Sequence, residues 1–447
     1  MSTTELFMLP EEVEDFISLT LEDDSLNTFS VNDGPEIGLC PYITFYVYHT
    51  EDQYLPLADK IIGIYDEFSK LIDVPFERIW KSDTQDWLPA DDKRLLSIDQ
   101  LKKRARDARD ELREFWIRAT DQESSASTAR WAFCGEVGDG GMRYTTLKLT
   151  FRHKWYRQNK VRWHAFVQHC LTLLQPEHCY SGFEVGNGGF TLIGAYESDV
   201  MERICADHFY GMDIDHATQM GFHSYRYHRD DALFEPVLVE GDDPSEKYTD
   251  PSDLGAGLRT PTWCFLLTPF WRDKLGKSAA DVRTELSDPN IEIVEIPFAV
   301  GPHNPRGEAA LWIRLGELDL HPVNKGVPEV LVKASRLIRP VRCDRLQLLT
   351  LDPWADDPNP RFDFQSAMRW MRRFDEDSDW PTQEKRRTIQ PSGSGATLRC
   401  EAGQPCPRDG EWETPAQANS RRRFKQGDPM PRQSTDYGET IWYWVRD

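Results

Sequence analysis

Residues 41–49 read PYITFYVYH, and residues 54–71 read YLPLADKIIGIYDEFSKL. The first stretch is rich in β-branched and aromatic side chains, which predicts a strand. In the second stretch, apolar side chains recur every three or four residues, which predicts a helix with one apolar face. These apolar residues are Leu57, Ile61, Ile64, Phe68 and Leu71. A strand that leads directly into an amphipathic helix is therefore the expected first pair of elements.

The same order recurs twice further along the chain. RYTTLKLTF at 143–151 predicts a strand, and a helix is expected after it over 161–174. RTPTWCFLLTPFWRDKLG at 259–276 begins as a strand and continues as a helix, and a further helix is expected over 98–118. This order predicts an α+β domain whose sheet is covered by helices on one face. It also suggests an internal duplication, although no repeat of the sequence itself is visible.

Composition divides the chain into four parts. Residues 1–36 are acidic and aperiodic, which indicates a lead-in with little core of its own. Residues 37–355 carry the expected strands and helices and form the α+β domain. Residues 356–398 are acidic and rich in Pro, Gly and Ser, which is typical of a linker. Residues 399–447 are rich in Trp, Arg, Gly and Pro, and we expect them to form a small β-rich module.

The chain is strongly acidic. It has 53 Lys and Arg against 75 Asp and Glu, so its formal net charge is −22. Such a protein is repelled by nucleic acid and by anionic membranes, and it is attracted to basic surfaces. We therefore expect neither a direct nucleic-acid partner nor a membrane partner. The alternative is that the acidity serves only to keep the protein in solution.

The sequence indicates a cytosolic protein. The N-terminal residues MSTTELFMLPEEVEDF lack the basic and apolar regions of a secretory signal. No apolar run approaches the roughly 18 residues that a spanning helix needs. The nine cysteines are scattered and odd in number, which is typical of reduced thiols in a chain without a signal.

No established catalytic motif is present, and we expect neither catalytic residues nor a cofactor. There is no P-loop, GxSxG or HExxH, and GNGG at 186–189 is not followed by an amphipathic helix. The densest potential metal site is HFYGMDIDHATQMGFHSYRYHRDD at 208–231, which leaves a metal-dependent enzyme as an alternative. Its candidate ligands are His208, Asp213, Asp215, His216, His223, His228, Asp230 and Asp231. We interpret this stretch as a polar surface connection, and Cys400 with Cys406 as a buried pair because no second cysteine pair follows.

Residues 37–355 resemble the type VI secretion immunity family. The resemblance rests on the order of the strand at 41–49, the LLQPEHCYSG stretch, the TPTWCFLL strand and the ALWIRLGELDLHPVNKGVPEVLVKASRLIRPVR run. One position departs from the family, because Thr262 stands where an Asn usually precedes Trp263. The positions that hold the pattern are Leu174, Pro176, His178, Tyr180, Ser181, Gly182, Leu275, Gly276, Ile313, Gly316, Asn324, Gly326, Leu337 and Pro340.

The last part of the chain resembles the tail of other bacterial immunity proteins. The stretch runs from Cys406 to Trp444. Its matching residues are Cys406, Pro407, Gly410, Trp412, Pro415, Ser420, Arg421, Arg422, Phe424, Gly427, Met430, Pro431, Tyr437, Gly438, Ile441, Trp442 and Trp444. These families have no catalytic residues to carry over to this chain.

The resemblance implies a non-catalytic immunity protein that binds and neutralises one cognate secreted toxin, by blocking its active site or its access to substrate. The net charge adds the hypothesis that this toxin is a basic, nuclease-type effector. The alternatives are a metal-dependent enzyme and an adaptor of the secretion apparatus, and the oligomeric state stays open. The candidate toxin-binding residues are Asp83, Asp86, Asp91, Asp92, Asp242, Asp243, Glu246, Asp250 and Asp253.

Overall fold

The fold is described from a computed structural model of the chain. It divides into two compact units, Met1–Pro381 and Thr382–Asp447, and each is described by itself. The residues that the structure describes are 8, 10–22, 28–30, 36–81, 86–111, 113–123, 128–138, 144–186, 196–220, 254, 257–301, 303–343, 359–381, 399–414, 420–432 and 441–445.

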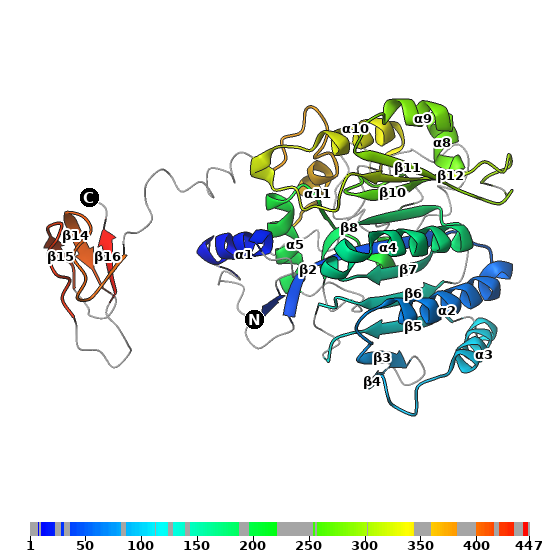
Figure 1. The fold of residues 1–447 in the computed structure, drawn as a ribbon, viewed down its shortest axis with the longest axis horizontal. Helices are drawn as coiled ribbons and strands as arrows, with labels where there is room; N and C mark the ends of the chain where they lie inside the picture. The colour runs from blue at the N-terminus through cyan, green and yellow to red at the C-terminus, as the bar shows by residue number, and fades with distance from the viewer. Residues whose placement is uncertain are drawn as a thin grey trace. The chain divides into compact units, whose positions relative to one another are not determined.

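One large sheet organises the first unit (Figure 1). Its main path runs β11-β12-β10-β8-β2-β7-β6-β5-β3-β4 through antiparallel pairs, β1 also pairs with β2, and the short β9 pairs in parallel with β8. The strands are β1 Thr28–Ser30, β2 Glu36–Val47, β3 Arg78–Lys81, β4 Asp86–Pro89, β5 Phe115–Thr120, β6 Ala132–Val137, β7 Thr145–Thr150, β8 His178–Gly186, β9 Met212–Asp213, β10 Cys264–Leu267, β11 Ile291–Ile296 and β12 Ala310–Leu315.

The strand predicted at 41–49 is the centre of this sheet. It is the main part of β2, which pairs with β8 from Gly38↔Gly186 to Tyr46↔His178 and with β7 along its other edge. Every side chain from 37 to 47 is buried. A strand buried on both faces reads as a nearly continuous apolar run, which is what the sequence shows.

Helices pack against the sheet, and several begin or end with a defined cap. Ser97 caps α3 and Ser278 caps α9, each in a capping box with the side chain three positions later.

Among the described residues, no helix combines the length and the apolarity needed to span a bilayer. The helices are α1 Pro10–Glu22, α2 Tyr54–Leu71, α3 Ile98–Asp110, α4 His153–Leu174, α5 Tyr196–His208, α6 Ala217–Met220, α8 Pro269–Leu275, α9 Ala279–Glu285, α10 Glu329–Ile338 and α11 Phe364–Met371.

The α+β class is confirmed, but the expectation that helices cover one face of the sheet is wrong. Cys264 and Leu266 of β10 belong to the core beneath α2 and α4, which lie over the front of the sheet in Figure 1. Phe265 and Leu267 belong to a second core with residues of α8, α9, α10 and α11. Because side chains alternate between the faces of a strand, the fully apolar CFLL buries both faces and requires cover on each.

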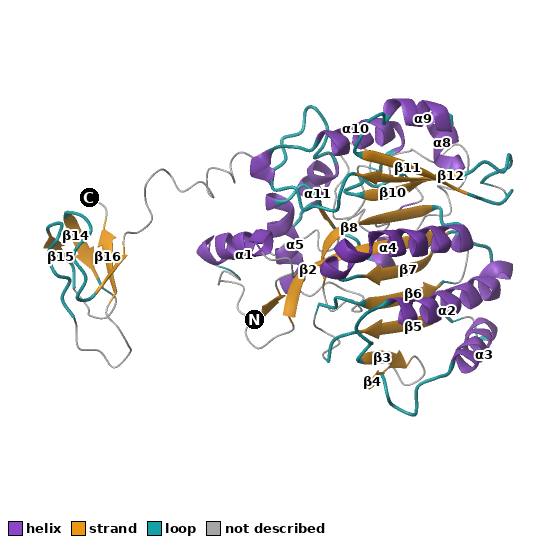
Figure 2. Cartoon of the chain, viewed as in Figure 1, coloured by secondary structure: helices purple, strands orange, loops and turns teal. Residues whose placement is uncertain are grey.

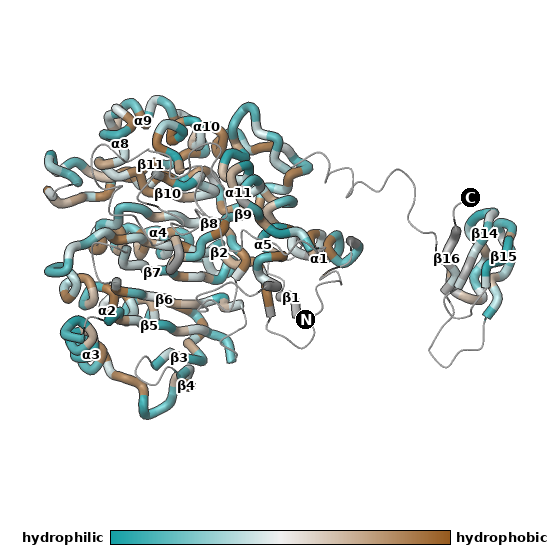
Figure 3. Tube along the Cα trace, turned by 180° about the vertical axis from the view of Figure 1, so that it is seen from behind, coloured by the Kyte–Doolittle hydropathy of each residue, from teal (hydrophilic) through white to brown (hydrophobic). Residues whose placement is uncertain are grey.

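Two predicted helices have different bounds in the structure. The helix expected over 98–118 ends at Asp110, and Phe115 begins β5 instead. Only Ala105 and Ala108 of α3 are buried, and its trace is mostly hydrophilic in Figure 3. The helix expected over 161–174 begins earlier, at His153, and kinks at Asn159, whose side-chain amide donates to the Trp155 carbonyl at 2.9 Å.

Both ends of the first unit contribute to its cores. Phe16 of α1, within the acidic residues 1–36, packs in the core beneath α2 and α4. Trp370 of α11, within residues 356–398, packs in the second core and is 1% exposed. These two helices therefore extend the α+β unit beyond the stretch that carries its strands.

The second unit contains a four-stranded sheet in the order β13-β16-β14-β15 (Figure 2). The strands are β13 Arg399–Glu401, β14 Gly410–Glu413, β15 Arg422–Phe424 and β16 Ile441–Val445. Its core consists of Cys400, Cys406, Trp412, Met430 and Trp442. The predicted β-rich terminal module is confirmed. Cys400 and Cys406 are not joined by a disulfide, and the other seven cysteines form none.

Two glycines of the first unit provide a matched test of how closely its backbone segments pack. A Cβ at Gly211 would lie 2.2 Å from the Asp319 carbonyl oxygen and 2.8 Å from that of Leu320, whereas a Cβ at Gly63 in α2 meets nothing within 4 Å. We expect Gly211→Ala to lower the free energy of unfolding by ~1–3 kcal/mol, because backbone must move. Gly63→Ala should raise it by ~0.5–1 kcal/mol through helix propensity. Urea denaturation of the two variants checks both signs, and an unchanged Gly211→Ala would contradict the packing.

Candidate functional site

A cluster of buried charges lies on the second face of the sheet, centred on Arg259. This arginine is 1% exposed. Its NH1 donates to the Ile214 carbonyl at 2.9 Å, and its NH2 contacts the Tyr42 hydroxyl at 2.8 Å and the carboxylates of Asp213 at 3.1 Å and Asp215 at 3.0 Å. The guanidinium thus pairs with two carboxylates that burial would otherwise destabilise.

Tyrosines of the central strands complete this cluster. The Tyr46 hydroxyl donates to Asp215 at 2.7 Å, and the Tyr42 hydroxyl donates to Asp213. The Tyr180 hydroxyl accepts from the Arg259 backbone amide at 2.9 Å, and its ring lies 4.5 Å from the guanidinium carbon. Strand β2 therefore holds Asp213 and Asp215 against the sheet through two hydroxyl groups, and the Tyr180 hydroxyl of β8 holds Arg259.

A second buried cation extends the cluster along the sheet. Lys148 of β7 contacts Glu184 of β8 at 2.6 Å and also donates to the Asp215 carbonyl. Burial opposes its charge, but the neighbouring carboxylates, Glu184 first, raise the pKa of Lys148 above its usual value. The ammonium therefore stays charged, and it ties three separate segments together.

The structure changes the interpretation of the His- and Asp-rich stretch 208–231. Its described part, 208–220, is largely buried, so the expected surface connection is wrong there. Asp213 and Asp215 pair with Arg259, whereas His216 contacts Glu202 at 2.9 Å, so the stretch splits between two ion-pair groups. His208 contacts the Ile204 carbonyl at 2.8 Å. Residues 221–231, with His223, His228, Asp230 and Asp231, lie outside the described residues.

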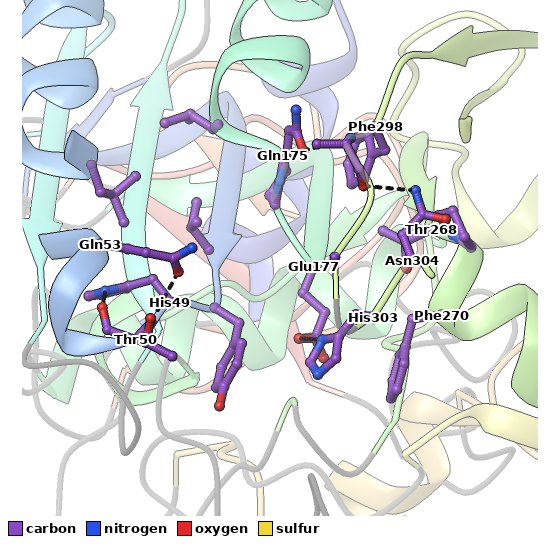
Figure 4. A pocket seen from close by; sticks show the side chains of 18 of the residues that line it. His49, Thr50, Gln53, Gln175, Glu177, Thr268, Phe270, Phe298, His303 and Asn304 are labelled. Carbon is purple, nitrogen blue, oxygen red and sulfur yellow. Dashed lines mark hydrogen bonds and ion pairs between the residues drawn. The ribbon is translucent and has the colours of Figure 1, made fainter. Parts of the chain in front are cut away.

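A pocket of about 490 Å³ opens where strands β2 and β8 meet at one end of the sheet (Figure 4). Four segments that are distant in sequence line it. They are the end of β2 with the start of α2 (47–60), the turn before β8 (174–177), the β10–α8 junction (268–270) and the β11–β12 hairpin (298–304). A concave site built from several chain segments with mixed polar and apolar walls is the usual form of a binding site.

Glu177 and His303 form the polar centre of the pocket, as Figure 4 shows. The His303 Nδ1 lies 3.3 Å from a Glu177 carboxylate oxygen, and the Tyr144 hydroxyl donates to the other oxygen at 3.1 Å. The imidazole stacks between Tyr48 and Phe270, with ring centroids 5.2 and 4.8 Å away. Burial alone would lower the pKa of His303, but the hydrogen bond and charge of Glu177 raise it above its usual value.

Other polar groups of the pocket divide into satisfied and unsatisfied ones. His49 Nδ1 contacts the Thr50 carbonyl at 3.0 Å, so it donates there, and Nε2 then accepts from the Thr145 hydroxyl at 2.8 Å. By contrast, burial lowers the pKa of Lys60, which has no ion pair with any described residue. Thr268 is 3% exposed, and its hydroxyl has no hydrogen-bond partner in the described part of the chain.

The structure describes three of the nine predicted toxin-binding residues. Asp86 begins β4 at one edge of the sheet, and Asp91 follows in the next turn, both exposed. Asp92 is half-buried, and hydrogen bonds from Arg94 lower its pKa to about 2. These carboxylates lie in a segment that does not line the pocket. The other six, Asp83, Asp242, Asp243, Glu246, Asp250 and Asp253, lie outside the described residues.

Sequence reasoning missed the pocket entirely. None of its polar residues forms a local motif, because Lys60, Glu177, Thr268 and His303 come from four separate segments. A local signal for it is HNP at 303–305, a turn-forming stretch between the sequences of β11 and β12. Within the described residues, no group of three or more His, Cys, Asp or Glu side chains is placed to hold a metal ion.

The Arg259 cluster makes a stability prediction. Arg259→Met removes the cation and leaves the carboxylates of Asp213 and Asp215 buried, which should cost ~3–5 kcal/mol in free energy of unfolding. Arg94→Met is the matched control, because its pair with Asp92 lies at the surface, where solvent screens the charges, and should contribute far less. Urea denaturation at neutral pH measures both, and equal small losses would show that the cluster does not stabilise the fold.

Comparison with known proteins identifies a shared fold. No protein-family model matches the chain, and the search of curated proteins finds no match. Among solved structures, a protein described as the Pseudomonas aeruginosa T6SS protein PA0821 is similar, with a TM-score of 0.59 and 16% sequence identity. The match covers 85% of this chain and 95% of that chain. At this identity, the likeness establishes that the two proteins share their architecture.

Proposed function

We propose that this chain is a cytosolic immunity protein that binds and neutralises a cognate effector of a type VI secretion system. The observation that carries the proposal is the structural likeness to a protein described as a T6SS protein, which covers 95% of that chain. The likeness therefore concerns a whole protein rather than one common motif. It agrees with the resemblance of residues 37–355 to the type VI immunity family.

The charge of the chain supports a basic effector of the nuclease type. Enzymes that cut nucleic acid need a cationic groove for the phosphate backbone. A partner with a net charge of −22 is attracted to such a groove and is steered toward it at long range. Blocking the groove, or blocking access to it, would then neutralise the effector.

The pairing of the buried charges favours a binding role over a metal-dependent enzyme. The described candidate metal ligands of the His- and Asp-rich stretch are His208, Asp213, Asp215 and His216. Asp213, Asp215 and His216 each contact a charged side chain of this chain, Arg259 or Glu202, and His208 contacts the Ile204 carbonyl. A ligand committed to an ion pair must lose that partner before it can bind a metal.

Co-production with the effector whose gene adjoins its own tests the proposal. We expect this chain to rescue growth, to form one stoichiometric complex in size-exclusion chromatography, and to abolish nucleic-acid cleavage by the purified effector. An unrelated effector is the control. A secretion adaptor should instead bind several components of the apparatus, and a metal-dependent enzyme should turn over substrate alone. Rescue against a lipase or peptidoglycan hydrolase only would contradict the nuclease class.

The exposed carboxylates at the β4 edge allow a kinetic prediction. Asp86→Lys with Asp91→Lys changes the charge by four, which should slow association with a basic effector by roughly tenfold at low salt and much less at high salt. Glu329→Lys with Asp99→Lys is the matched control, because it changes charge equally on α10 and α3. Stopped-flow association rates at two salt concentrations check this. Equal slowing by both pairs would indicate general steering without a role for this edge.

A further inference from the structure

One cation of the pocket is available to a ligand. Lys60 lines the pocket and carries an ammonium with no ion pair among the described residues. Glu177, the carboxylate of the pocket, is already contacted by His303 and Tyr144. The pocket therefore offers a positive charge, and its own carboxylate is already hydrogen-bonded.

The rest of the lining is apolar, and it continues to the surface. Phe270 and Phe298 form part of the walls. Val300, on the hairpin between β11 and β12, is 74% exposed at the pocket. An exposed apolar side chain beside an apolar-walled pocket is typical of a surface that a partner covers.

We propose that this pocket anchors the effector by taking a carboxylate carried on an apolar or aromatic frame, such as an acidic side chain beside an apolar residue. The ammonium of Lys60 pairs with the carboxylate, and the apolar frame packs against Phe270, Phe298 and Val300. This inference rests on the proposed immunity function and names the chemistry of one contact within it.

The proposed contact suits a protein whose overall charge is −22. Long-range attraction draws in any basic protein and so discriminates poorly between them. A cationic pocket accepts a carboxylate and disfavours a lysine or arginine at the same position, because like charges would meet in a partly desolvated site. The pocket would therefore select, among basic proteins, the one partner that places an acidic group at this position.

A small probe tests the chemistry of the pocket in the full chain. N-acetyl-L-phenylalanine carries a carboxylate on an aromatic frame, and N-acetyl-L-phenylalaninamide has the same frame without the charge. We expect ligand-observed NMR to detect binding of the acid, and about tenfold weaker binding of the amide. Equal binding of the two probes, or none by the acid, would overturn the proposal.

Variants of Lys60 locate the effect. We expect Lys60→Gln and Lys60→Glu each to weaken effector and probe binding by about tenfold or more, because both remove the ammonium. Lys103→Glu is the matched control, since Lys103 is exposed on α3 and does not line the pocket, and it should change affinity by less than about twofold. Unchanged melting temperatures verify that the variants are folded, and unchanged affinities for both Lys60 variants would overturn the proposal.

Thr268→Val is a second control. It replaces a buried hydroxyl that lacks a hydrogen-bond partner among the described residues with a methyl group of similar shape, so the fold should keep its stability. We expect the acid probe to bind this variant as it binds the natural chain, because the hydroxyl is buried away from the ligand. An effector that binds normally to every pocket variant would overturn this inference and leave the immunity function standing. An effector bound by neither the natural chain nor any variant would overturn the immunity function itself.

Discussion

Strand β2 has two buried faces, and the rest of the first unit depends on this constraint. Ile43 and Phe45 point into the core beneath α2 and α4, whereas Tyr46 points into the opposite core. Neither face can be left to water, because a central strand without cover would expose apolar side chains on one side. The requirement for cover on both faces explains why helices follow β2 on one side and β10 on the other.

The tyrosines of β2 create a second constraint, because a buried hydroxyl must find a partner. Tyr42 and Tyr46 meet this need with Asp213 and Asp215, and those carboxylates in turn need a buried cation. Arg259 supplies it from a segment that directly precedes β10. The buried tyrosines of β2 therefore require the Asp213, Asp215 and Arg259 cluster, and that cluster holds β9 and the residues before β10 in place.

Local sequence patterns correctly predicted the helices and strands that are determined by neighbouring residues. The apolar spacing from Leu57 to Leu71 and the β-branched run at 41–49 both gave the correct element, because neighbouring residues determine periodicity. The helix expected over 98–118 ran too far, because Phe115 is held by its pairing with Val137 in β6, which no local pattern contains. Asp213, Asp215 and His216 were misread for the same reason, since their partners lie far away in sequence. The pocket could not be predicted, because Lys60 of α2, Thr268 and His303 line one cavity only once the sheet and its helices have packed together.

The end of β2 connects the fold to the proposed binding pocket. Beyond Tyr46 the strand has no further partner in β8, since the register between them ends at Tyr46↔His178, and the two strands separate at the pocket. Two contributions to partner binding can then be distinguished by their dependence on salt. Attraction by the overall charge acts over roughly one Debye length, about 8–10 Å at physiological ionic strength, and weakens as salt rises. Contact with Lys60 acts within a partly desolvated pocket, where screening is weaker. A partner held mainly by the first contribution dissociates as salt rises, whereas one held by the second keeps a specific contact after the steering is gone.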